Sequence, residues 1–244
     1  PGKDLKHSSD GDLLSRMLLH EDERVFVLNK PAGLAVQGGS GVVRHIDKML
    51  EAWTNKKGEK PRLVHRLDRD TSGCLLLAKS RPALLTLNAA LKQHKMDKRY
   101  LALVQGRWPV RRDFVSARLD RFDAGNGERR VRVDPDGKVA RTRFAVRETL
   151  PGVTLIEAEP VTGRTHQIRV HAAHAGFPLL GDDKYGRRQS HQLAARLGLE
   201  RLFLHAASLE FPEPSSGRPV RIRAPLGDDL EGVLARARDQ ADDR

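Results

Sequence analysis

Short apolar runs, and apolar residues that alternate with polar ones, predict strands in the first half of the chain. The segment "ERVFVLNK" has strand character and ends at Pro31, which has no backbone N–H to donate to a sheet. The run "GCLLLAKS" at 73–80 predicts a buried strand, and residues 98–108 alternate between apolar and polar positions. Three strands are therefore expected before residue 110.

Turn sequences divide the second half of the chain into further strands. Within residues 129–165 the turns "DPDG", "LPG" and "VTG" follow three segments of strand character, and the segments 201–214 and 218–225 flank the turn "SSG". Connections this short favour antiparallel neighbours.

Apolar residues recur at helical spacing in four segments. Helices are predicted at 42–53, at 81–96, at 166–176 and from residue 227. The strands follow one another too closely for an alternating βαβ pattern. The sequence therefore predicts an α+β fold, with a mostly antiparallel mixed central sheet and flanking helices.

Both ends of the chain are polar. Residues 1–20 include "GKDLKHSSDGD" and are predicted to form a tether, and residues 239–244 a charged tail. One folded domain is expected over residues 21–238. Because the chain begins at Pro1 rather than at methionine, we expect the full protein to continue on the N-terminal side.

Composition favours a cytoplasmic protein that binds nucleic acid. The formal net charge of +12 over 244 residues favours a polyanionic partner, although an arginine-rich composition can also serve solubility alone. Aromatic residues make up 5% of the chain, too few for a long platform of stacked single-stranded bases. The single cysteine, Cys74, excludes an internal disulfide and fits a reducing compartment. No apolar run approaches the roughly 20 residues that span a bilayer.

The segment "VHRLDRDTSG" (64–73) has the densest charge in the chain. Its "DRDT" part matches the Asp-x-Asp-x-Thr pattern of phosphotransferases with an aspartate nucleophile, and "GDD" at 181–183 would then supply magnesium ligands. That chemistry needs an apolar strand leading directly into the first aspartate of a doubly wound sheet. His65 and Arg66 interrupt such a run here, so we reject this alternative.

Histidines near the third motif raise the alternative of a metal site. His171 and His174 are three residues apart and would share a helix face, with His166 or an aspartate as a further ligand. No His-Glu-x-x-His pattern is present, and Arg164 and Arg169 would repel a cation. RNA contacts or hydrogen bonds in the core are therefore preferred for these histidines, and no metal is predicted.

Asp68 becomes chemically interesting when it is considered together with distant residues. A carboxylate that acts as nucleophile or base must stay ionised, and a nearby guanidinium favours its charged form. Arg169 lies between Ile168 and Val170 in a predicted helix and is placed to point inward, with an exposed helix position as the alternative. Tyr100 lies on a predicted strand, where it either packs in the sheet or serves as a stacking plate for a base.

Three long motifs occur in a fixed order: "HRLDRDTSG", "KRYLALVQG" and "GRTHQIRVH…GFPLLGDDKYG". The segments "NKPAGLAVQGGSG" and "RLFLHAASLEF" flank them. Together, over residues 22–228, they resemble the RluA/RluC/RluD family of RNA pseudouridine synthases. The spacing and the "GGSG" loop most resemble the RluC subgroup, which modifies large-subunit (23S-type) ribosomal RNA in bacteria.

The resemblance implies roles for individual residues. Asp68 matches the family's catalytic aspartate, Tyr100 the tyrosine that stacks on the target base, and Arg169 the arginine that pairs with the catalytic carboxylate. Substrate contacts are expected from Arg66, His65, Arg164, His166 and the apolar Leu204. Gln37 departs from the family, many members of which have histidine there, and this puts a peripheral RNA contact in doubt.

The resemblance also implies a fold in two halves with a catalytic cleft between them, and a small S4-like RNA-binding domain before residue 1. The reaction needs no cofactor and no metal, because uridine and pseudouridine are isomers. Whether Asp68 attacks covalently or removes a proton from the sugar stays open. The alternative function is an RNA-binding module of ribosome assembly with weak or no catalysis. We expect a monomer that acts on ribosomal RNA and not on membranes.

Overall fold

The computed structural model describes residues 9–39, 41–125 and 127–242, and the chain divides into two compact units. Unit 1 comprises Pro1–Asp97 and Ala206–Pro225, and unit 2 comprises Lys98–His205 and Leu226–Arg244. Within the described residues, no helix is long and apolar enough to cross a membrane.

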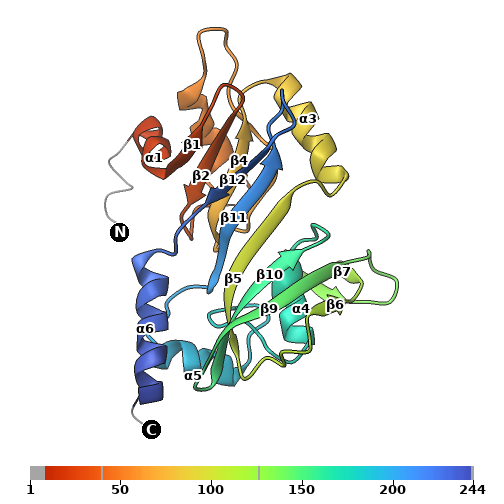
Figure 1. The fold of residues 1–244 in the computed structure, drawn as a ribbon, viewed down its shortest axis with the longest axis vertical. Helices are drawn as coiled ribbons and strands as arrows, with labels where there is room; N and C mark the ends of the chain where they lie inside the picture. The colour runs from red at the N-terminus through yellow and green to blue at the C-terminus, as the bar shows by residue number, and fades with distance from the viewer. Residues whose placement is uncertain (1–8, 40, 126, 243–244) are drawn as a thin grey trace. The chain divides into compact units, whose positions relative to one another are not determined.

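Unit 1 is a sheet with short helices around it (Figure 1). Its strands follow the order β1-β2-β4-β11-β12, with β3 beside β4. The pairs β1–β2, β2–β4, β3–β4 and β11–β12 are antiparallel. The elements are α1 (Asp10–Met17), β1 (Leu18–Glu21), β2 (Val25–Lys30), α2 (Ile46–Met49), the 3-10 helix η2 (Leu50–Trp53), β3 (Arg62–Leu63), β4 (Ser72–Ala78), α3 (Arg81–Lys92), β11 (Leu204–Pro212, of which unit 1 holds the part from Ala206) and β12 (Pro219–Arg223).

The most apolar segment of the sequence forms the centre of unit 1. Every residue of β4 is buried, as expected for a strand with neighbours on both edges and covered faces. Its side chains join a core with Val25 and Val27 of β2, and α3 packs against β3 and β4. The strands predicted before Pro31 and at 73–80 are thus confirmed, as is the helix that begins at Arg81.

The predicted tether over residues 1–20 is wrong for its second half, where residues 10–20 form α1 and most of β1. The side chain of Ser9 accepts a hydrogen bond from the Asp12 N–H and caps α1. Leu13, Leu14 and Met17 are buried, so the polar residues of the first turn hide a short amphipathic helix. Residues 1–8 of the predicted tether lie outside the described residues.

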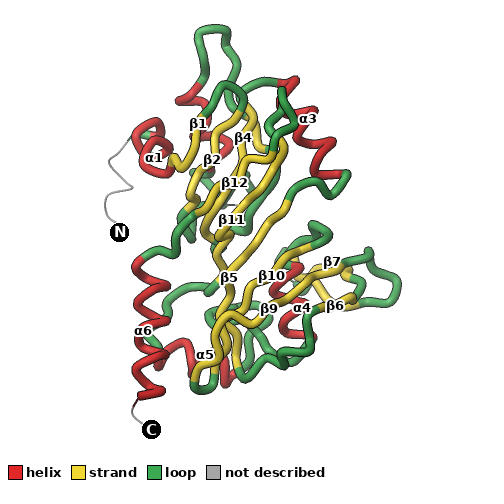
Figure 2. Tube along the Cα trace, in the orientation of Figure 1, coloured by secondary structure: helices red, strands yellow, loops and turns green. Residues whose placement is uncertain are grey.

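In unit 2 the strands β5, β10, β9 and β6 are neighbours in that order (Figure 2). Strands β7 and β8 form a separate two-stranded sheet. The pairs β5–β10, β10–β9, β9–β6 and β7–β8 are all antiparallel. The elements are β5 (Asp97–Gln105), β6 (Phe114–Ser116), β7 (Leu119–Asp123), β8 (Arg129–Val133), β9 (Arg141–Leu150), β10 (Val153–Pro160), α4 (Gln167–His174), α5 (Arg188–Arg196) and α6 (Asp228–Asp242).

The two faces of the unit 2 sheet carry different cores. Tyr100 of β5 lies opposite Ala158 of β10, and this face packs against α4 through Ile168. Leu103 and Leu155 point to the other face and pack with buried residues of α5 and α6. The alternation predicted for residues 98–108 therefore holds, and it separates Tyr100 from the α5 and α6 core.

The α+β, largely antiparallel character is confirmed, with exceptions in unit 2. Strands β6 and β7 and helix α5 were not predicted. The "DPDG" turn joins β8 to β9, but these strands are not partners, because β8 pairs with β7 and β9 with β10 and β6. The loop that follows β8 instead bonds to Arg118 and Leu119: the Asp134 N–H donates to the Arg118 carbonyl at 3.0 Å, and the Leu119 N–H donates to the Lys138 carbonyl at 2.9 Å.

Candidate active site

Asp68 lies in the loop between β3 and β4 of unit 1, outside any regular element. Val64 and Leu67 are buried and anchor the loop, whereas Arg66 is exposed and Asp68 is half-buried. The Thr71 N–H donates to the Asp68 carbonyl at 3.1 Å, which closes the turn. The His65 Nε2 accepts the Leu76 N–H at 3.0 Å, so this ring is fixed to β4 with its proton on Nδ1.

Lys30 fixes the backbone directly after Asp68. Its side chain is fully buried, and its Nζ donates hydrogen bonds of 2.8 Å to the carbonyls of Pro31, Leu34 and Arg69. The Gly33 N–H also donates to the Arg69 carbonyl, at 2.9 Å. A buried ammonium is tolerated only with such partners, so this set of bonds determines where the loop can lie. The sequence reasoning missed Lys30, although a lysine that ends an apolar strand just before proline is a usable signal.

The exit from this loop requires glycine. Gly73 has φ of +112°, and a Cβ on it would lie 2.2 Å from the Ala206 carbonyl oxygen of β11. No side chain fits there, because the approaching atoms belong to backbone. Asp70 pairs with its neighbour Arg69, with bonds of 3.0 and 3.1 Å.

Unit 2 brings Tyr100 and Leu204 into one apolar cluster. Leu204 is buried in this cluster, Tyr100 packs against it, and Ile168 of α4 joins them. Arg169 is the next residue of α4, so the helix that completes this cluster also positions the arginine.

Arg169 points inward, as expected, with a side chain only 6% exposed. Its Nε and Nη2 donate to the two carboxylate oxygens of Asp182 at 2.8 and 2.7 Å, and Nη2 also lies 3.4 Å from Asp183. Burial opposes ionisation of Asp182, but the guanidinium and the N–H groups of Lys184 and Tyr185 hold its pKa below the ordinary 3.8. The structure therefore gives Arg169 a buried carboxylate partner that the sequence reasoning did not identify.

His166 and Tyr185 lie beside this ion pair. The Tyr185 ring packs against the guanidinium, with 5.1 Å from the Arg169 Cζ to the ring centroid. Its hydroxyl lies 2.7 Å from the His166 Nδ1 and accepts the Val131 N–H of β8 at 2.9 Å. His166 has φ of +52°, a left-handed conformation that is uncommon for residues other than glycine. The motif "GDDKYG" contained the signal for Asp182 and Tyr185.

Arg164 is exposed in the loop before α4. Its Nε donates to the Val139 carbonyl at 3.0 Å, and its N–H donates to the Gln167 Oε1 at 3.0 Å. Gln167 is buried and also donates to the Arg141 carbonyl at 2.7 Å, so it ties the loop to β9. The structure thus groups Arg164, His166 and Arg169 at the start of α4.

His171 has the core role preferred over metal binding. Its Nε2 donates to the Ala117 carbonyl at 2.9 Å, and its Nδ1 lies 2.8 Å from the Thr142 hydroxyl. Burial lowers its pKa, which favours the neutral ring. Among residues 9–39, 41–125 and 127–242, no group of three or more His, Cys, Asp or Glu side chains is arranged to hold a metal ion.

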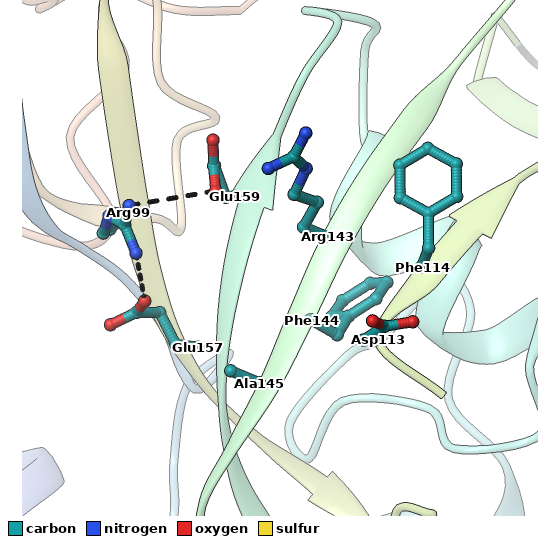
Figure 3. Close-up of a pocket in the computed structure, with 8 residues that line it drawn as sticks. All are labelled: Arg99, Asp113, Phe114, Arg143, Phe144, Ala145, Glu157 and Glu159. Carbon is teal, nitrogen blue, oxygen red and sulfur yellow. Dashed lines mark hydrogen bonds and ion pairs between the residues drawn. The ribbon is translucent and has the colours of Figure 1, made fainter. Parts of the chain in front are cut away.

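A groove of unit 2, with a volume of about 450 Å³, contains none of the predicted site residues (Figure 3). Arg99 in its wall pairs with Glu157 at 2.8 Å and lies 3.9 Å from Glu159. Tyr100 points to the opposite face of β5, by strand alternation. With Asp113 also in the wall, carboxylates outnumber the two arginines, which disfavours RNA phosphate.

Comparisons with known proteins agree with the motifs. A family model described as RNA pseudouridylate synthase matches residues 24–174. A protein of Escherichia coli K12 named ribosomal large subunit pseudouridine synthase C is 48% identical over 227 residues, which cover 92% of this chain and 71% of that protein. The protein of that name from Pasteurella multocida is 46% identical over 227 residues, or 93% of this chain and 69% of the relative.

Two solved human structures share the fold. RNA pseudouridylate synthase domain containing 4 superposes with a TM-score of 0.77 at 27% identity, covering 93% of this chain and 95% of that one. RNA pseudouridylate synthase domain containing 1 gives a TM-score of 0.69 at 26% identity, over 86% and 82% of the two chains. The extent of the family match and the identity to these relatives lead to one conclusion: the chain belongs to the RNA pseudouridylate synthase family.

Proposed function

We propose that this protein isomerises specific uridines to pseudouridine in large-subunit ribosomal RNA. The observation that carries the proposal is the identity of 48% to a relative named for this activity, over 92% of the chain. The family match over residues 24–174 includes the loop with Asp68, strand β5 with Tyr100 and helix α4 with Arg169. Ribosomal RNA lies in the cytoplasm, where we place the reaction.

Three residues are proposed to do the chemistry. Asp68 is the working carboxylate, held in a loop whose backbone Lys30 fixes. Tyr100 is the plate on which the target base stacks, and its partly buried position beside an apolar cluster suits that use. Arg169 is the guanidinium that keeps Asp68 ionised. A guanidinium has five N–H donors, so binding to Asp182 through Nε and Nη2 is compatible with a second carboxylate.

Other residues are proposed to hold the nucleotide. Arg66 and Arg164 are exposed and suit contacts to phosphate, which position RNA without reading its sequence. Leu204 would line the pocket of the base. The remaining substrate contacts are assigned to His65 and His166, each of which also has a structural hydrogen bond described above.

The reaction rearranges bonds within one nucleotide. The N1–C1′ bond breaks, the base turns, C5 bonds to C1′, and the hydrogen on C5 is lost while N1 gains one. Atoms and electrons balance without a co-reactant. The target uridine has to leave its stack at a cost of a few kcal/mol, which stacking on Tyr100 and phosphate contacts would offset. Tyr100 is also a candidate to accept the C5 proton, directly or through water.

Mapping of pseudouridine tests this function. Large-subunit ribosomal RNA from cells that lack the enzyme is incubated with the purified protein, and pseudouridine is located by chemical modification and sequencing. We expect new pseudouridine at a few discrete uridines, also in the presence of EDTA. An RNA that the protein binds but leaves unmodified would instead favour the assembly module.

A further inference from the structure

Asp182 holds Arg169 in one orientation. Two nearly parallel N–H···O bonds of 2.8 and 2.7 Å join the guanidinium to the carboxylate, and such a bidentate contact fixes the plane of the guanidinium as well as its position. The side chain of Asp182 is fully buried. A lysine at position 169 could replace the charge but not this geometry.

The backbone fixes Asp182 in turn. Its Oδ1 accepts the N–H groups of Lys184 at 3.0 Å and Tyr185 at 3.1 Å, so the carboxylate cannot turn without losing them. Gly181, just before it, has φ of +75°, and a Cβ there would lie 2.0 Å from the Arg201 carbonyl oxygen. The backbone at Gly181 therefore passes so close to Arg201 that it has little freedom to move, and this fixes the position of the next residue, Asp182.

Tyr185 covers the guanidinium from a second direction. Its ring lies against the Arg169 Cζ, and its hydroxyl connects His166 at the start of α4 with the Val131 N–H of β8. Arg169 is thus held along its edge by Asp182 and across its face by Tyr185. The ion pair is weak evidence for a role in stability, because a buried ion pair replaced by apolar residues of similar volume often leaves stability equal or higher.

We propose that Asp182 is a positioning residue for the isomerisation: it acts through Arg169, whose N–H groups it aims, and does not touch RNA. This inference rests on the proposed function, in which Arg169 keeps the catalytic carboxylate ionised. It adds that the arginine works only when a second, buried carboxylate orients it.

The test compares Asp182→Asn with Asp183→Asn in single-turnover assays at saturating RNA. Asparagine keeps an acceptor for the two backbone N–H groups but offers Arg169 one oxygen in place of a carboxylate. We expect the rate to fall about 100-fold, as for a misplaced catalytic group, with RNA affinity within about threefold of the wild type. Asp183 is 70% exposed and lies 3.4 Å from the same Nη2, so Asp183→Asn should stay within about threefold in rate.

Two further variants separate positioning from stability. Leu193→Ala, in the core of α5 and α6, destabilises unit 2 away from Arg169 and should keep the wild-type rate at a temperature where it is folded. In a protein that already carries Arg169→Lys, adding Asp182→Asn should lower the rate by less than about threefold, because the effects of substitutions in residues that act as a unit are not additive. The proposal is overturned if the fold-losses in rate of the two single variants multiply in the double variant. It is also overturned if the rate of Asp182→Asn stays within threefold of the wild type.

A crystal structure of the variant decides the matter without activity. In Asp182→Asn, or in Asp182→Glu if the first variant does not fold, the Arg169 guanidinium should move or adopt several orientations. An unchanged guanidinium, within about 0.5 Å of its place in the wild type, contradicts the inference. If the wild type makes no pseudouridine, the proposed function fails, but the structure of the variant still shows whether Asp182 orients Arg169.

Discussion

The loop around Asp68 in unit 1 and the loop around Asp182 in unit 2 hold their functional side chains in opposite ways. In unit 1 the buried ammonium of Lys30 binds backbone carbonyls, one of them next to Asp68, so the main chain is fixed while the Asp68 side chain is half-buried. In unit 2 a buried carboxylate binds the Arg169 side chain itself. Asp68 is thus placed through the backbone of its loop, whereas Arg169 is placed through its guanidinium group.

The two largest effects on stability are expected at buried charged side chains, and the first of these is Lys30, which holds the backbone. Lys30→Met keeps most of the buried volume but removes the Nζ donor of three carbonyls, of which the Arg69 carbonyl keeps the Gly33 N–H. The free energy of unfolding should fall by about 3–5 kcal/mol, since each buried unsatisfied group costs about 1–3 kcal/mol. Urea denaturation measures this fall. Lys79→Met is the matched control, because Lys79 makes an ion pair with the exposed Glu21 and its loss should cost less than about 1 kcal/mol. Equal losses in both variants would contradict the role of Lys30.

The side-chain pair in unit 2 should show a different pattern. Arg169→Leu alone leaves Asp182 buried and unpaired, and should cost about 3–5 kcal/mol of stability. The double variant Arg169→Leu with Asp182→Asn removes both charges, keeps an acceptor for the Lys184 and Tyr185 N–H groups, and should recover much of that loss. Activity should be lost in both. Thermal melts and the pseudouridine assay together test this, and recovery of activity in the double variant would disprove the importance of the pair.

The pH dependence of stability sharpens the same contrast. The folded-state pKa of Asp182 is lowered below 3.8, so its ionisation contributes stability that is present above the unfolded pKa and is lost as pH falls through the folded value. The difference in unfolding free energy between the wild type and Asp182→Asn should stay constant from pH 8 to about 5 and shrink below about pH 4. A difference that instead grows in acid has the wrong sign for this account. Denaturant titrations across pH measure it.

The smallest effect is expected at Thr71, in the Asp68 loop. Its hydroxyl is buried, and it has no hydrogen-bond partner among the described residues. Thr71→Val removes this polar atom at nearly constant volume, so stability should change by less than about 1 kcal/mol or rise. A large loss in urea denaturation would show that the hydroxyl is engaged in the folded protein. Around the Asp68 loop, the buried polar group of Lys30 is thus expected to contribute most to stability and that of Thr71 least.

The sequence predicted the parts of the site that short motifs and periodicity encode. The loop position of Asp68, the strand of Tyr100 and the inward direction of Arg169 follow from residues near each of them. The contacts that hold these residues are not local: Lys30 binds a carbonyl 39 residues away, and Tyr185 lies 19 residues from His166. Periodicity carries no information about such pairs, so Lys30, Asp182 and Tyr185 were missed.

The errors in the fold have a similar origin. Helix α1 spans only 8 residues, and its polar first turn resembles a linker until the Ser9 cap and the burial of Leu13 and Leu14 are known. Strand β7 carries alternating charges with only Leu119 buried, so no apolar pattern marked it. Turn residues after β8 predicted a hairpin with β9, but the choice of strand partner depends on the whole sheet.

The central claim is that the Asp68 carboxylate carries out the isomerisation. The most direct test is the single-turnover rate of Asp68→Asn on large-subunit ribosomal RNA, with Asp70→Asn, two residues away in the same loop, as the matched control. We expect Asp68→Asn to form no detectable pseudouridine while RNA affinity stays within about threefold, because phosphate contacts supply most of the binding. Asp70→Asn should remain active. Pseudouridine formed by Asp68→Asn at the wild-type rate would contradict the account.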